Sequence, residues 1–302
     1  MIGIMTPGAL GFGFRIGHWT EPRRRTGCTV VLPPAGNVAS CDIRGSSPSS
    51  RELPLLDLHR RLTEVHAVLL TGGSAFGLAA AEGVVTWLEE RGIGYGTRIA
   101  TVPIVPAAVI FDATAGEPGL RPDAAAGRAA CEAATDGPVD TGCVGAGAGA
   151  TVGKWAGWGG SSPGGLGIAS ASASGHAVSA LVVANSLGDV VDTDGSVLAG
   201  ADVSGTRDPG GAIQSDDHPP PNTVIGVVAV QADLDKREVA WLAARGSDGI
   251  TVSVRPAHTR YDGDVMFAVA GPAPGEPPSD LDLLGRLATD AVAAAVRAGV
   301  GA

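Results

Sequence analysis

A polar stretch meets an apolar run at the bond between Asn222 and Thr223, and this junction constrains the fold more than any other feature of the chain. Residues 195–222 are rich in Gly, Asp and Pro and end in three prolines, so they predict a long surface segment. Residues 223–232 read TVIGVVAVQA and predict a buried strand. The chain must therefore anchor a surface segment directly against its core.

Further strands and helices follow from the hydrophobic pattern. Apolar runs predict strands at 28–34, 65–70, 179–192, 250–255 and 264–270. Helical spacing predicts helices at about 74–91, 123–135 and 234–245 and from about 280, the first and third ending at Gly92 and Gly246. Because strands and helices alternate irregularly, we expect an α+β sandwich with two sheets inside and helices outside.

Composition limits the classes of function. The 302 residues are 44% hydrophobic and 17% charged, which suits one sizeable domain. A net charge of −10 opposes nucleic-acid binding, and the one basic cluster, Arg23 to Arg25, is short. We expect no membrane span, because no run of ~18 apolar residues occurs. The N-terminus lacks a basic region typical of a signal peptide, so a cytoplasmic location is expected.

Neither the cysteines nor the histidines predict a metal site. The four cysteines, Cys28, Cys41, Cys131 and Cys143, form no CxxC pair and are expected to be buried free thiols. The six histidines show no HExxH spacing and are expected to be structural or exposed. We therefore expect no cofactor and no metal.

Two nucleotide-binding motifs are incomplete in the glycine-rich stretch 142–168, which is expected to be loop and irregular strand. Walker A fails because Ala148 and Trp155 occupy fixed positions of the pattern. The dinucleotide fingerprint fits from Gly145 to Ala150 but has no helix after it.

Ser74 lies between a predicted strand and a predicted helix, where a nucleophilic serine of the G-x-S-x-G type could sit. That motif needs Gly at the position of Phe76, so the pattern favours a helix N-cap.

The Asn222-Thr223 bond has a specific chemistry of its own. Cleavage there would give Thr223 a free α-amine beside its hydroxyl, so that nucleophile and general base share one residue. An α-amine titrates near ~7.7 to 8, which suits proton transfer at neutral pH. The same hydroxyl could make the cut by attacking the Asn222 carbonyl. As a pattern alone, Thr223 is more simply the β-forming first residue of a strand.

Several stretches in the same order together resemble the P1 family of peptidases, a self-processing group that includes L-aminopeptidase/D-esterase, β-peptidyl aminopeptidases and 6-aminohexanoate-oligomer hydrolase. They are RIGHWT (15–20), TGCTVVLPP (26–34), RGSSPSSRE (44–52), LLTGGSAFGLAAAEGVVTWLEERGIGYG (69–96), VPIVPAAVIFD (102–112), VGAGAGATVGK (144–154), ANSLGDVVD (184–192), NTVIGVVA (222–229) and HTRYDGDVMFAVAG (258–271).

The resemblance implies an αββα sandwich of the N-terminal-nucleophile hydrolase type. It also implies cleavage between Asn222 and Thr223, giving an α-fragment, 1–222, and a β-fragment, 223–302, that stay associated as one hydrolase domain. Relatives form homo-oligomers of the processed unit, so a homo-oligomer is expected.

Site residues carry over from the family's motifs. Thr223 matches the nucleophile, and Asp262 and Asp264 match the acidic pair that orients it and its amine. Alternation along a strand would place both aspartates on one face; as a pattern alone they could form a solvated turn. Asn185 matches the amide that stabilises the oxyanion, and Lys154 matches a lysine near the nucleophile in the oligomer-hydrolase branch.

The chain departs from the family pattern at three positions. Val224 and Val230 replace threonines, and Ala148 stands where some members have Thr. These departures leave the efficiency of self-cleavage open. Because the nucleophile, the acidic pair and the oxyanion residue are intact, we expect an active aminopeptidase on peptides or small amides that works through an acyl-Thr223 intermediate. The alternatives are a hydrolase of polyamide oligomers or pantetheine-type amides, and an uncleaved, catalytically silent binding protein.

Overall fold

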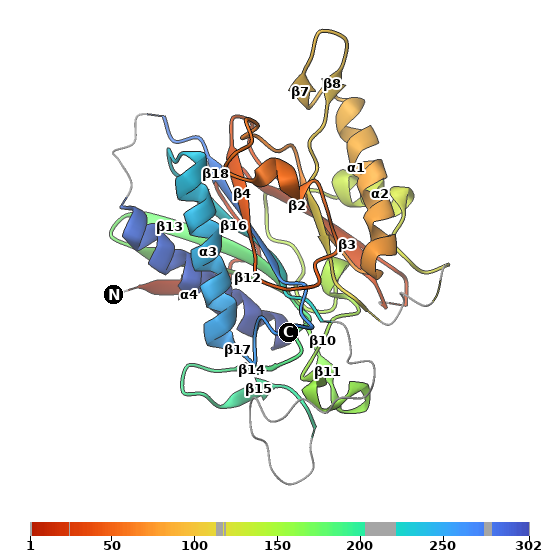
Figure 1. Ribbon diagram of the computed structural model, residues 1–302, viewed down its shortest axis with the longest axis vertical. Helices are drawn as coiled ribbons and strands as arrows, with labels where there is room; N and C mark the ends of the chain where they lie inside the picture. The colour runs from red at the N-terminus through yellow and green to blue at the C-terminus, as the bar shows by residue number, and fades with distance from the viewer. Residues whose placement is uncertain are drawn as a thin grey trace.

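Two β-sheets form the centre of the computed structural model, which describes residues 2–23, 25–112, 117, 119–202, 222–274 and 280–301 (Figure 1). The large sheet has the order β1-β12-β13-β16-β18-β4. These strands are Gly3–Met5, Gly165–Ala173, His176–Ala184, Ile225–Gln231, Val265–Gly271 and Val38–Ile43. The small sheet has the order β2-β3-β6-β9-β5, made of Arg15–Thr20, Gly27–Leu32, Val68–Thr71, Ala107–Val109 and Ser50–Arg51.

Helices and short strands complete the fold. The α-helices in the described ranges are α1 (Ala80–Glu89), α2 (Ala124–Glu132), α3 (Lys236–Ser253) and α4 (Leu281–Val300). Short strand groups are β7 (Tyr95–Gly96) with β8 (Thr101–Val102), β10 (Thr151–Val152) with β11 (Ser162–Pro163), and β14 (Asp189–Val191) with β15 (Val197–Ala199) and β17 (Val254–Arg255). Single 3₁₀ turns are η1 (Leu53–Leu56), η2 (Ser74–Ala79), η4 (Gly145–Gly147), η5 (Lys154–Ala156) and η6 (Trp158–Gly160).

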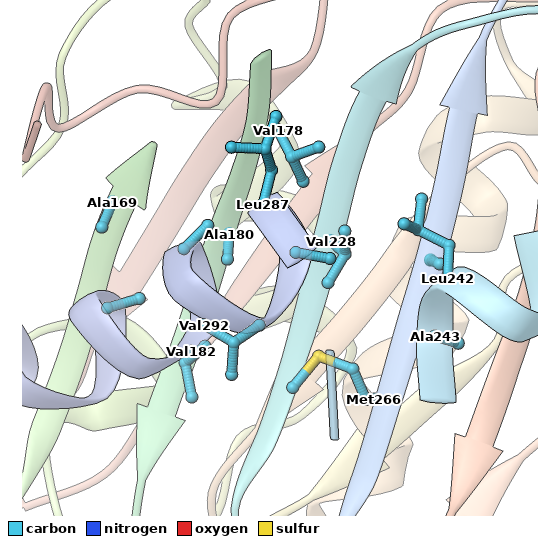
Figure 2. Close-up of a cluster of buried hydrophobic side chains, with 14 of the residues drawn as sticks. Ala169, Val178, Ala180, Val182, Val228, Leu242, Ala243, Met266, Leu287 and Val292 are labelled. Atoms are coloured by element: carbon cyan, nitrogen blue, oxygen red, sulfur yellow. The ribbon is translucent and has the colours of Figure 1, made fainter. Parts of the chain in front are cut away.

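Helices α3 and α4 cover the outer face of the large sheet (Figure 2). Alternate residues of its central strands face these helices, as period-two geometry requires. On the sheet side the contacts include Val178, Ala180 and Val182 of β13, Val228 of β16 and Met266 of β18; on the helix side they include Leu242, Ala243, Leu287 and Val292. This apolar layer holds α3 and α4 to the sheet.

The intervening residues of the same strands face the small sheet. Leu181, Val227 and Phe267 pack there in one buried cluster with Val31 and Leu70 of the small sheet. The other face of the small sheet, with Val30 and Leu69, packs on α1 and α2 through Val84, Trp87 and Ala130. The layers therefore run helix, sheet, sheet, helix, which confirms the expected αββα sandwich.

The third predicted helix is wrong at its C-terminal end, because α3 continues to Ser253 where a strand had been expected over 250–255. Only Val254 and Arg255 are extended. The apolar face of the helix continues through Ile250, which is buried with Leu242 in the same core cluster. Burial along one helical face thus outweighs the β-preference of Thr251 and Val252.

Gly246 does not end this helix. A Cβ there would lie 2.8 Å from Val228 Cγ2 and 2.9 Å from Met266 Cγ, so glycine allows α3 to approach the sheet closely.

Three further expectations concerned the cysteines, a membrane span and the surface segment before Thr223. The cysteines are free, but Cys143 is exposed and Cys41 half-buried, so burial of all four was wrong. Within the described ranges, no helix is long and apolar enough to cross a membrane. Most of the predicted surface segment, residues 203–221 with its three prolines, lies outside the described residues.

Candidate active site

The register of the large sheet brings three distant parts of the sequence together. Ile225 of β16 pairs with Val183 of the antiparallel β13 and with Val265 of the parallel β18. Thr223 lies two residues before Ile225, just ahead of β16. The equivalent positions on the neighbouring strands are Asn185, directly after β13, and Gly263, just before β18. Strand pairing therefore places the predicted nucleophile between the predicted amide and the middle of the Asp-Gly-Asp segment.

The peptide bond between Asn222 and Thr223 is held on both sides. The Thr223 N–H donates to the main-chain oxygen of Asn185 at 3.0 Å. The Asn222 carbonyl oxygen accepts from the Gly263 N–H at 2.9 Å and from the Thr223 hydroxyl. Asn222 and Thr223 are buried, and Asn222 forms an isolated parallel bridge with Asp262. The Thr223 hydroxyl thus lies against the carbonyl group of the preceding residue.

Lys154 and Asn185 form a buried pair beside this bond. Lys154 Nζ donates to the main-chain oxygen and Oδ1 of Asn185 at 3.0 and 2.9 Å, and to the oxygen and Oγ1 of Thr151 at 2.8 and 3.2 Å. Both Lys154 and Asn185 are fully buried. Burial lowers the pKa of Lys154 to about 7, against the opposing negative charge of Asp262.

The side-chain amide of Asn185 has a fixed orientation. Its Oδ1 also accepts from the Thr151 N–H at 3.0 Å, and its Nδ2 donates to the Phe111 carbonyl at 3.3 Å. In the uncleaved chain, this side chain therefore supports Lys154, while its main-chain oxygen holds the Thr223 amide.

Asp262 and Asp264 are both buried and have different partners. Asp264 Oδ1 accepts from the Val224 N–H at 2.6 Å. Asp262 Oδ2 accepts from the Thr259 N–H at 2.6 Å, whereas its Oδ1 has no hydrogen-bond partner among the described residues. Burial, followed by the charge of Asp264, raises the pKa of Asp262 to about 6. A solvated turn is excluded by this burial, and the pair precedes β18 rather than lying within a strand.

Gly263 leaves no space for a larger residue. A Cβ at this position would lie 2.7 Å from the Ser47 carbonyl oxygen and 3.0 Å from Thr223 Oγ1. The segment around Ser47 is held in place, because the Ser47 N–H donates to the main-chain oxygen of Asp262 at 3.1 Å. Glycine therefore permits the contact between this loop and the Thr223 hydroxyl.

Sequence reasoning missed His258, which was expected to be only structural or exposed. Its Nδ1 lies 2.7 Å from Asp264 Oδ2, and its Nε2 lies 3.2 Å from the Ser247 oxygen. Burial of the ring opposes its charge, but the hydrogen bond with Asp264 raises the pKa of His258 above its usual value. Its position six residues before Asp264, in the HTRYDGD stretch, was the available signal.

Ser74 does not cap a helix, so that expectation was wrong. It is the first residue of η2, and its φ is +56°. The cap position is occupied by Gly73, which has no side chain to cap with. The Ser74 N–H donates to the Ile110 oxygen at 3.0 Å. The turn after β6 is therefore held by main-chain contacts.

Aromatic side chains gather around the site, although the chain has only five Trp, five Phe and two Tyr. The Phe111 and Trp158 ring centroids lie 6.4 Å apart, and Lys154 Nζ lies 5.7 Å from the Trp158 ring centroid. Tyr261 packs against the buried cluster of Trp155, Leu187 and Ala201. Trp158 is 42% exposed, so it offers an aromatic surface to solvent next to the buried lysine.

Metal ligands do not converge here. In the part of the chain that the structure describes, no group of three or more His, Cys, Asp or Glu side chains could hold a metal ion.

Comparison with known proteins identifies the family. The model of peptidase family S58 matches residues 12–302. The chain belongs to peptidase family S58. This confirms the resemblance noted from the sequence motifs, and the protein is a hydrolase.

Curated relatives carry aminopeptidase and amide-hydrolase names. An uncharacterised aminopeptidase of Mycobacterium tuberculosis is 39% identical, over 95% of this chain and 91% of its own length. The 6-aminohexanoate-oligomer endohydrolase of Paenarthrobacter ureafaciens is 32% identical, over 93% of this chain and 79% of its own.

Two solved aminopeptidase structures share the fold. A β-aminopeptidase of Burkholderia sp. superposes with a TM-score of 0.71 at 23% identity, covering 99% of this chain and 88% of its own. The L-aminopeptidase D-Ala-esterase/amidase of Ochrobactrum anthropi, described as a variant of the Ntn hydrolase fold, gives 0.71 at 21% identity, covering 98% and 86%.

Proposed function

We propose that this S58 hydrolase is a self-processing amidohydrolase that cuts its own Asn222-Thr223 bond and then uses Thr223 as an N-terminal nucleophile. The contact of the Thr223 hydroxyl with the Asn222 carbonyl oxygen carries the proposal. The Gly263 N–H on the same oxygen supports it, because a donor there stabilises negative charge as it develops.

Self-cleavage proceeds by an N-to-O acyl shift. Thr223 Oγ bonds to the Asn222 carbonyl carbon, its proton passes to a base, and the oxyanion is held by the Gly263 N–H. The C–N bond then breaks, and the nitrogen takes a proton to become the Thr223 α-amine. Water hydrolyses the resulting ester, releasing the Asn222 carboxylate and the Thr223 hydroxyl. Asp262 is our choice of base, because its Oδ1 is buried without a hydrogen bond among the described residues.

In the processed enzyme the same groups act on a substrate amide. The α-amine of Thr223 accepts the hydroxyl proton, Oγ attacks the substrate carbonyl, and the amine product leaves with a proton. Water then hydrolyses acyl-Thr223. We assign Asn185 Nδ2 to the substrate oxyanion, and Lys154 to orienting Asn185 through its Oδ1.

The two fragments are expected to remain one unit. Strand β16 of the fragment 223–302 lies between β13 and β18, and β18 pairs with β4 of the other fragment. Separation of the fragments would break the β13–β16 and β18–β4 ladders and expose the apolar layer under α3 and α4. Assembly of processed units into a homo-oligomer is part of the proposal.

The substrate we favour is a peptide with a free N-terminus or a related small amide, in keeping with the aminopeptidase names of the relatives. A polyamide oligomer is the second candidate, favoured by the similarity to the 6-aminohexanoate-oligomer endohydrolase.

Intact mass spectrometry with N-terminal sequencing tests the proposal. Purified protein should give two species, the smaller beginning TVIGVV. The Thr223→Ala variant should stay full length and inactive, and Thr223→Ser should restore the fragments. A wild-type chain that persists at full length would contradict self-processing and leave a silent binding protein as the better reading.

A further inference from the structure

His258 links helix α3 to the acidic pair. Its backbone is in the left-handed region, with φ +52°, which non-glycine residues adopt uncommonly. The ring is mostly buried, with 14% of the side chain exposed, and both ring nitrogens have partners. Such a backbone conformation persists only where the surrounding contacts fix it, and it is common at functional sites.

The two partners determine where the protons lie. The Ser247 carbonyl oxygen can only accept, so Nε2 carries a hydrogen. Nδ1 then faces a carboxylate oxygen 2.7 Å away, and this contact is a hydrogen bond only when a proton lies between them. A protonated ring opposite an ionised Asp264 satisfies both contacts and is charge-assisted.

Asp264 transmits this contact to the nucleophile. Its second oxygen accepts from the Val224 N–H, the amide that follows Thr223. The main-chain oxygen of Asp264 accepts from the Arg44 N–H at 3.2 Å, so the residue is fixed from its other side as well. The ring of His258 is therefore two hydrogen bonds away from the backbone that carries Thr223.

The charges around His258 are paired. Arg44 is the cation that faces it from the end of β4, and Arg44 bonds Asp42 Oδ2 at 2.8 Å and Asp248 Oδ1 of α3 at 2.7 Å. On its own segment, the neighbouring carboxylates are Asp264 and Asp262. With Arg44 neutralised elsewhere, the ring supplies the positive charge that Asp264 meets directly.

We propose that His258 is a positioning residue of this site: its ring, held by Ser247, fixes the Asp264 side chain so that its other oxygen stays aimed at the Val224 amide. It thereby fixes Thr223 and leaves Asp262 as the carboxylate free to exchange a proton. This role rests on the proposed self-cleavage and divides the acidic pair into an anchor, Asp264, and a base, Asp262.

The first test follows self-cleavage of His258→Asn, since asparagine tolerates a left-handed backbone but cannot carry the charge. At neutral pH, appearance of the small fragment should slow by about tenfold or more, which corresponds to about 1.4 kcal/mol of activation free energy. The acid limb of its pH profile should move to higher pH, because a cation near Asp262 is lost. The control, His66→Asn, removes a half-buried histidine whose Nδ1 accepts from the Ile104 N–H, and should leave both unchanged.

The second test is independent of cleavage. In the full-length Thr223→Ala protein, nitrogen NMR of labelled histidines should show one ring, absent in the His258→Asn form, that is protonated at both nitrogens above pH 6.5. The same ring should lose its proton at lower pH when Asp264→Asn is added. A neutral His258 ring at pH 6, or a slowed variant with an unmoved acid limb, would overturn the positioning role. Failure of wild type to cleave would instead overturn the proposed function.

Discussion

The amide of Thr223 and the buried ammonium of Lys154 share one acceptor, the main-chain oxygen of Asn185, each at 3.0 Å. Thr223 is thus joined to the chain's most buried lysine through a single carbonyl group. After cleavage, the new α-amine would face the same oxygen, so one acceptor serves the amide before the cut and the amine after it.

Replacement of Lys154 by Met should slow self-cleavage by about tenfold to a hundredfold. It leaves the Thr151 main-chain oxygen without its donor and removes one of the two donors of each Asn185 oxygen. An unsatisfied buried group costs about 1–3 kcal/mol, and Asn185 loses a contact that fixes its orientation. The time course of fragment appearance measures the effect. Lys236→Met is the matched control, because this other lysine also donates to main-chain oxygens, in its case those of Leu55, Arg60 and Leu62. Lys236→Met should lower thermal stability without slowing cleavage. Equal cleavage rates for the two variants would show that Lys154 has no role in cleavage.

Gly263→Ala should nearly abolish processing. Its Cβ would lie 2.7 Å from the Ser47 oxygen and 3.0 Å from Thr223 Oγ1, so the hydroxyl or the Gly263 N–H has to move. A shift of about 1 Å at reacting atoms can reduce a rate by about a hundredfold. Gly271→Ala, at the other end of β18, would place its Cβ 3.0 Å from Pro34 Cγ and 3.7 Å from the Val230 oxygen, far from Thr223, and should process normally. Wild-type cleavage in Gly263→Ala would show that the contact is unimportant.

The rate of self-cleavage should rise as the pH increases through about 6. The pKa of Asp262 is raised from 3.8 to about 6 by burial and by Asp264, and only the ionised form can accept a proton. Stability should change in the opposite direction. A raised folded-state pKa stabilises the fold fully below about 3.8, and this stabilisation is lost as the pH rises through about 6.

Both effects can be measured separately. Quenched time courses between about pH 5 and 8 give the rate, and unfolding of the Thr223→Ala protein between about pH 3.5 and 7 gives the stability. Adding Asp262→Asn to that protein should remove this pH dependence of stability. A cleavage rate that stays flat between pH 5 and 7 would assign the base to another group.

Much of the candidate site was predicted from the sequence through the resemblance to the peptidase family, which pointed to Asn185, Thr223 and the pair of Asp262 and Asp264. The apolar runs 179–192, 223–232 and 264–270 indicated three strands, and their register then brings Asn185, Thr223 and Gly263 level. His258 was not predictable in this way. Its role depends on α3 presenting the Ser247 oxygen, and the sequence pattern had ended that helix at Gly246, before Ser247.

The same helix shows why the rest of the fold needed the structure. Gly246 usually signals a helix end, yet here it lies against Val228 and Met266, a contact between residues far apart in sequence. Gly246→Ala should therefore destabilise the protein by about 1–2 kcal/mol, since overpacking costs about 1–3 kcal/mol and the better helix propensity of alanine returns up to ~1. Denaturant unfolding of the Thr223→Ala form measures this, and a more stable variant would show that the side chains move aside freely.

Trp158 should set preference among amide substrates. Its exposed ring lies beside Lys154 and Phe111, so it can pack against an apolar or aromatic side chain next to the scissile amide. Stacking adds about 0.5–1.5 kcal/mol to apolar burial, so Trp158→Ala should lower kcat/KM for a phenylalanyl anilide by about tenfold. The alanyl anilide, too short to reach the ring, should change by less than about threefold.

Trp241→Ala on α3 is the control and should alter kcat/KM for neither anilide. Equal losses on both anilides would mean that Trp158 only supports Lys154, whereas no hydrolysis of any anilide by wild type would count against aminopeptidase activity itself.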